Sequence, residues 1–103
     1  MSEKTPNQTA QDVEKAINNP EIPKLYTNGF ITATGNGDAL IVLQQNGNPI
    51  ATLNLSYTMA KTLTLRLGHL VKDLENKTGN TIMTTTDIDN ALINPEKDKN
   101  DEN

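Results

Sequence analysis

The sequence predicts an α+β fold, in which an antiparallel β-meander of three to four strands is followed by one long amphipathic helix, with short helices on either flank. Two observations support this prediction. The apolar residues concentrate between Leu25 and Leu74, and within that region turn-bounded strand patterns give way to helical spacing. At 103 residues the chain has the length of one small domain. We expect an N-terminal arm with a short helix at 1–24, a core at 25–79, and a C-terminal arm at 80–103 with a short helix and a disordered acidic tail.

Turns rich in glycine and asparagine divide the first half of the core into strands. We expect strands at about 25–34, 39–45 and 50–55, with turns at 35–38 and 46–49. In the first of these turns, the pair Asn36-Gly37 supplies the positive φ that a tight hairpin needs. The third strand alternates between apolar and polar residues, which is typical of a strand with one covered face.

The second strand differs, because Ala39–Leu43 is apolar on both faces. Such a strand is typically central and covered on both sides. One helix covers only one face. We expect the second face to carry Ile41 and Leu43, with Ile31 or Phe30 according to the register. Either the N-terminal helix or a second subunit covers it, and we favour a second subunit because a bare apolar patch invites aggregation.

The main helix is predicted to begin after Ser56, a favourable N-cap, and to end at Gly79. Its apolar stripe comprises Ala60, Leu63, Leu67, Leu70, Val71 and Leu74. Leu65 lies on the opposite side of this helix, either as an isolated exposed leucine or as part of a second contact surface. The candidate interface residues are Phe30, Ile31, Ile41, Leu43 and Leu65.

Helix-capping patterns also occur in both arms. Thr9 with Asp12 predicts a short N-terminal helix that ends before Pro20. In the C-terminal arm, residues 81–85 are a candidate fourth strand.

A second short helix is predicted after Thr86, which forms a similar capping pattern with Asp89. The charged segment 96–103 is predicted to be disordered.

No arrangement of residues indicates catalysis. The chain has no cysteine, which excludes disulfides, thiolate metal sites and cysteine nucleophiles. We interpret His69 and Asp73 as a solvated pair on the helix surface, and Asp87 and Asp89 as helix-capping residues without calcium-loop spacing. Gly35–Gly37 is followed by a strand and lacks the Gly-Lys-Ser/Thr of a phosphate loop. We therefore expect no enzyme activity, no cofactor and no metal.

The net charge of -4 is unevenly distributed. Residues 25–79 carry four cations and three acids, whereas residues 80–103 carry six acids and two lysines. A near-neutral core lacks the basic footprint of a nucleic-acid-binding protein. The first 19 residues are polar and lack the apolar segment of a signal peptide. The apolar run Ala39–Leu43 is too short to span a membrane, so we expect a cytoplasmic protein without membrane contact.

Three short motifs carry a family resemblance: Tyr26-Thr27-Asn28 at the entry to the first strand, the meander Phe30–Leu55, and Ser56-Tyr57-Thr58-Met59-Ala60-Lys61-Thr62-Leu63 at the start of the helix. Over residues 26–74 the chain resembles a small, mostly bacterial family of unknown function, the DUF 3467 type. Members often have proline where this chain has Tyr57. The resemblance implies the same strand–strand–strand–helix order and brings no activity, cofactor or catalytic residue.

The sequence thus predicts a non-catalytic protein-binding or assembly module. It would act as a homodimer or as a small subunit of a larger complex, with another copy or a larger protein as its partner. The alternative is a dimer that binds single-stranded nucleic acid, by analogy with other sheet-plus-helix dimers.

Overall fold

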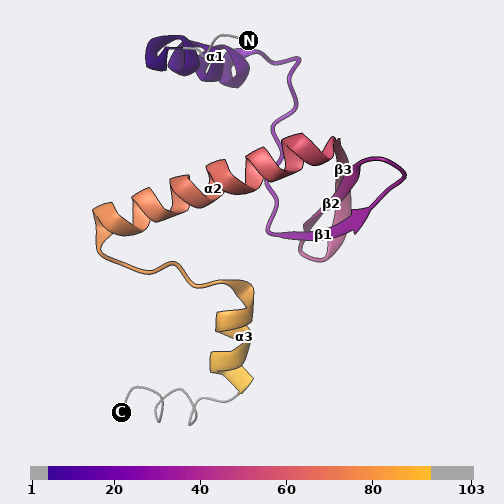
Figure 1. The fold of residues 1–103 in the computed structure, drawn as a ribbon, viewed down its shortest axis with the longest axis vertical. Coiled ribbons are helices and arrows are strands. Elements are labelled where there is room, and N and C mark those ends of the chain that lie inside the picture. Colours follow the sequence, from indigo (N-terminus) through magenta and orange to yellow (C-terminus); the bar gives the residue numbers. More distant parts are fainter. Residues whose placement is uncertain (1–4, 94–103) are drawn as a thin grey trace. The chain divides into compact units, whose positions relative to one another are not determined.

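The computed structural model describes residues 5–93 and places six helices and strands there (Figure 1). The fold is α+β, as predicted. The chain divides into two units, one ending at Leu55 and the other beginning at Ser56. This boundary lies within the segment 25–79, whose status as a single core stays a prediction. In chain order the elements are α1 (Pro6–Asn18), β1 (Gly29–Thr34), β2 (Ala39–Gln45), β3 (Asn48–Leu55), α2 (Tyr57–Thr78) and α3 (Thr85–Ile93).

The first unit contains an antiparallel sheet with the strand order β1-β2-β3. The expected bounds of β2 and its central position are confirmed. The tight connection between β2 and β3 has positive φ at both central residues, 53° at Asn46 and 83° at Gly47. Two positive φ values are the requirement of a type I′ turn, whose twist matches that of the flanking strands. The pairing of β2 with β3 shifts by one residue near this turn, because Leu43 pairs with Ala51 and Gln44 pairs with Pro49. This shift is a β-bulge.

The first strand is shorter than expected, because β1 begins at Gly29 and not near residue 25. Asn28, the residue before β1, is held by its side chain. Its side-chain amide donates a hydrogen bond to Oδ1 of Asn46 at 2.9 Å, and its own Oδ1 accepts one from the Asn46 backbone N–H at 2.9 Å. Asn28 therefore fastens the start of β1 to the β2–β3 turn through its side chain.

The helix α1 begins one turn earlier than the sequence patterns indicated. Its N-cap is Thr5, whose Oγ1 accepts a hydrogen bond from the Gln8 N–H at 3.2 Å, while Gln8 Oε1 accepts one from the Thr5 N–H at 3.1 Å. Pro6 occupies the first turn, where the absence of an N–H costs nothing. The expected cap at Thr9 is thus wrong, and the capping box uses Thr5 and Gln8.

Both predicted ends of α2 are confirmed. Ser56 Oγ accepts a hydrogen bond from the Met59 N–H at 3.1 Å. At the other end, Gly79 has a φ of 71°, and its N–H donates to the Glu75 carbonyl at 2.9 Å. Glycine suits this position because the left-handed conformation imposes no Cβ penalty on it.

The fourth strand expected at 81–85 does not form in the described structure. Residues 80–84 have no regular secondary structure, and Thr85 already belongs to α3. The capping box of α3 lies two residues before the predicted one: the Asp87 N–H donates to Thr84 Oγ1 at 3.1 Å, and the Thr84 N–H donates to Asp87 Oδ2 at 3.0 Å. The predicted disordered tail lies outside the described residues.

Side chains in the described part of the chain are poorly covered. No residue between 5 and 93 is buried. The best-covered continuous segment is β2, which is half-buried from Ala39 to Gln44. These residues therefore lack the fully buried side chains that normally form a hydrophobic core.

Candidate interaction surface

Strand register decides which sheet residues share a face. Directly opposed residues of antiparallel strands lie on the same face, and successive residues along a strand lie on opposite faces. Phe30 lies opposite Leu43, and Ile41 lies opposite Leu53. Leu43 is also opposite Ala51. We define the apolar sheet face by its apolar residues, which are Phe30, Ala39, Ile41, Leu43, Ala51, Leu53 and Leu55. Two threonines of β1, Thr32 and Thr34, lie on the same face.

This face remains open at its two outer strands. The exposed fraction is 67% for Phe30 on β1 and 41% for Leu53 on β3. On the central strand, Ile41 and Leu43 are half-buried. None of the residues in β1, β2 or β3 carries a charge. Because no ionised group would have to be desolvated on the sheet, packing against another apolar surface is favourable there.

The opposite face of the sheet is more mixed. Ile31 lies opposite Val42, which places both on this second face together with Leu40. The corresponding residues of β3 are Thr52 and Asn54, which are polar and exposed. The part of this face that β3 contributes beside Leu40 and Val42 is therefore polar.

The register divides the candidate interface residues predicted from sequence. Phe30, Ile41 and Leu43 lie together on the apolar sheet face, whereas Ile31 lies on the opposite face. Leu65 lies on α2, in the second unit, with 57% of its surface exposed. Leu53 is absent from the interface residues predicted from sequence. The alternation of the third strand placed it on one face with Ala51 and Leu55, but only the strand register shows that it lies opposite Ile41.

Polar groups elsewhere have structural roles. Asp73 forms an ion pair with Lys77 one turn later, with 2.9 Å between Oδ2 and Nζ. Asp87 caps α3, as predicted for this residue. Within residues 5–93, no three histidine, cysteine or acidic side chains are grouped so that they could hold a metal ion.

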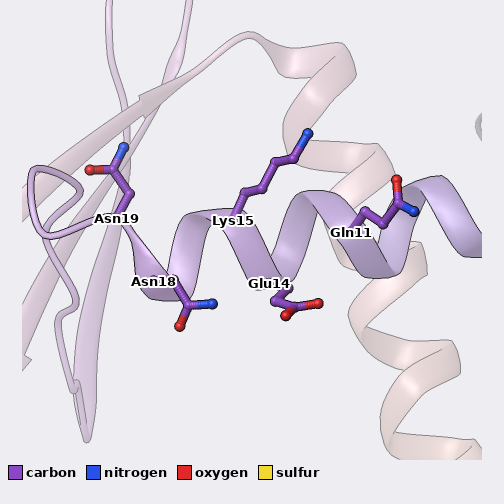
Figure 2. A pocket seen from close by; sticks show the side chains of 5 residues that line it. All are labelled: Gln11, Glu14, Lys15, Asn18 and Asn19. Carbon is purple, nitrogen blue, oxygen red and sulfur yellow. The ribbon is translucent and has the colours of Figure 1, made fainter.

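A shallow hollow lies on the surface of α1. Its lining consists of Gln11, Glu14, Lys15, Asn18 and Asn19. Figure 2 shows Gln11 and Lys15 directed to one side of the helix and Glu14 and Asn18 to the other. Side chains that diverge from a single helix do not converge on a ligand, so this hollow lacks the arrangement of a small-molecule site.

Comparisons with known proteins add no relative. The chain matches no protein-family model, no curated protein and no solved structure. The resemblance to the DUF 3467 type therefore stays a prediction. Among the described helices, none combines the length and apolar character needed to cross a membrane.

Proposed function

We propose that this protein is a non-catalytic assembly module that binds another protein chain through its apolar sheet face, either as a homodimer or as a small subunit of a larger complex. One observation carries the proposal: an uncharged face that is apolar along β2 and β3 reaches Phe30 on β1 and is open at Phe30 and Leu53. We also propose the cytoplasm as its location, which fractionation of cells expressing the tagged chain tests.

Apolar side chains between residues 5 and 93 are only partly covered, and none of these residues is buried. Burial of apolar surface is the main favourable term in folding. Small domains bury too little of it alone, and oligomerisation is a common solution. A partner that covers the apolar sheet face would bury Ile41 and Leu43, the half-buried side chains of β2 that lie on this face.

The chemistry of the sheet favours a protein partner over nucleic acid. Binding of single strands relies on cations along a groove and on aromatic side chains that stack with bases. The three strands carry no cation, and Phe30 is their one aromatic residue. A protein dimer that binds single-stranded nucleic acid is therefore the second candidate, and the experiments below include a test for it.

Two neighbouring substitutions on β1 test the proposal. Phe30 and Ile31 are adjacent, exposed and on opposite faces of the sheet. We expect Phe30→Asp to dissociate the complex and Ile31→Asp to leave it largely intact, as measured by light scattering coupled to size exclusion. Dissociation by Ile31→Asp alone would refute the assignment of the face.

The mass of the unaltered chain is the second measurement. The homodimer requires a particle of twice the 11.3 kDa chain mass, and the subunit form requires co-purification of a larger protein from the native cell. A monomer that captures no protein would contradict both. Binding to single-stranded DNA that weakens steeply with added salt would favour the alternative.

A further inference from the structure

The helix α2 carries a second apolar surface with a regular spacing. Leucines recur at intervals of four, three and four residues, and Ala60 continues the pattern toward the N-terminus. Leu67, Leu70 and Leu74 expose 51%, 62% and 47% of their surfaces. This spacing is that of the a and d positions of a heptad, where helices pack side by side. We call Leu63, Leu67, Leu70 and Leu74 the leucine seam.

Two opposite charges flank this seam on the same side. Arg66 precedes Leu67, and Asp73 lies seven residues after Arg66, so both occupy g positions if Leu67 is an a position. Charges at e and g positions set the partner and the orientation of paired helices. In a parallel pair, g positions face e positions, and Arg66 would face Val71. In an antiparallel pair, g positions face each other, and Arg66 would face Asp73.

We propose that α2 pairs with α2 of a second copy of this chain in an antiparallel arrangement, with the two-fold axis between Leu67 and Leu70. Each Leu67 then meets the Leu70 of the second copy, and each Leu63 meets its Leu74. The two-fold axis generates the Arg66–Asp73 pair twice.

The occupant is a second copy because the seam is complementary to itself. Reversal of the helix about its centre superimposes leucines on leucines and exchanges the positive and the negative flank, which is the requirement of an isologous interface. At the ends, Ala60 lies opposite Lys77, whose aliphatic stem can cover the small alanine while its ammonium stays in water. Leu65 lies outside this contact. Like the proposed function, this inference requires the chain to associate with a partner. It further specifies that two copies of α2 pair and that they run antiparallel.

Charge reversal tests the arrangement. We expect Arg66→Asp to weaken the dimer about tenfold, because this variant loses two exposed ion pairs and creates two like-charge contacts. Asp73→Arg should weaken the dimer at least as much, because it also removes the ion pair of Asp73 with Lys77 in the same helix. The double variant Arg66→Asp/Asp73→Arg restores opposite charges and should recover affinity to within about threefold of the unaltered chain. Sedimentation equilibrium measures the dimer Kd.

Lys72→Asp is the matched control, because it changes the charge as Arg66→Asp does but lies away from the seam, at an f position. Its dimer Kd should be unchanged. The proposal is overturned if the unaltered chain is monomeric, if single reversals have no more effect than Lys72→Asp, or if the double variant is no better than the singles.

Cross-linking determines the orientation directly, because the chain has no cysteine of its own. A disulfide requires Cα atoms within about 7 Å. An oxidised mixture of Leu67→Cys and Leu70→Cys chains should yield the mixed covalent dimer. Efficient cross-linking of Leu67→Cys with itself would indicate a parallel pair and overturn the proposal.

The two proposed interfaces can fail separately. If Phe30→Asp dissociates the protein while the charge reversals have no effect, the sheet interface is supported and the helix pairing is wrong. If the charge reversals weaken the dimer while Phe30→Asp has no effect, the helix pairing is supported and the sheet interface is wrong.

Discussion

Replacement of Leu53 by aspartate probes the apolar sheet face at its outer strand. Leu53 lies opposite Ile41 and exposes 41% of its surface. Complete burial of a leucine contributes about 1.5 to 3 kcal/mol, so closing the exposed 41% contributes about 0.6 to 1.2 kcal/mol per copy. A symmetric dimer contains this contact twice, so the variant loses about 1.2 to 2.5 kcal/mol of binding free energy. This loss raises the dimer Kd about 8- to 60-fold. The cost of burying an unpaired carboxylate adds to this loss.

Thr52→Asp provides the control for this measurement. Thr52 is the preceding residue of β3, is exposed, and lies opposite Val42 on the other face of the sheet. Both variants introduce the same charge and the same poor strand former at neighbouring positions. Sedimentation equilibrium should show a weakened dimer for Leu53→Asp and a change of less than about threefold for Thr52→Asp. Equal weakening by both variants, with circular dichroism showing both folded, would refute the assigned face.

Three further substitutions test local features through urea unfolding. Gly47→Ala should lower the free energy of unfolding by about 1 to 3 kcal/mol, because φ at this position is 83°; an unchanged midpoint would contradict the turn geometry. Ser56→Ala removes the acceptor for the Met59 N–H and should cost about 1 kcal/mol, so unaltered stability would argue against this cap. Gly68→Ala should raise stability by about 1 kcal/mol, since a Cβ there meets nothing within 4 Å. A weaker dimer in Gly68→Ala would instead place Gly68 against the partner.

Local signals allowed several elements to be predicted closely. The apolar run of β2 was predicted with the bounds that the structure shows. The turn expected at 46–49 is shorter, because Asn46 and Gly47 alone form it and β3 begins at Asn48 and not at residue 50. Ser56 and Gly79 similarly mark the two ends of α2. Each of these signals depends on only a few adjacent residues, so no long-range information was needed.

The start of α1 shows where local signals compete. Thr5 and Thr9 are both followed three residues later by a polar residue that can complete a capping box. The structure uses Thr5, and the presence of Pro6 directly after it is the feature that distinguishes the two, because proline is favoured at the first helical position. The cap of α3 differs from the prediction in the same way: Thr86 with Asp89 was expected, and the structure uses Thr84 with Asp87.

The candidate surface could be predicted only in part, because strand register is a long-range property. A slip of one residue moves every side chain to the other face, so the sequence allowed either Phe30 or Ile31 beside Leu43. The register places Phe30 there. Leu53 joined the face only when the pairing of β2 with β3 positioned it opposite Ile41.

If this chain completes its apolar core by binding a second copy of itself, its unfolding by urea depends on protein concentration. Stability that depends on association rises with protein concentration, by about 2.7 kcal/mol for a hundredfold increase. With a denaturant slope of about 1 to 3 kcal/mol per molar, the urea midpoint should rise by about 1 to 3 M over that range. A midpoint that stays the same at every concentration, for a chain purified without a partner, would contradict the account.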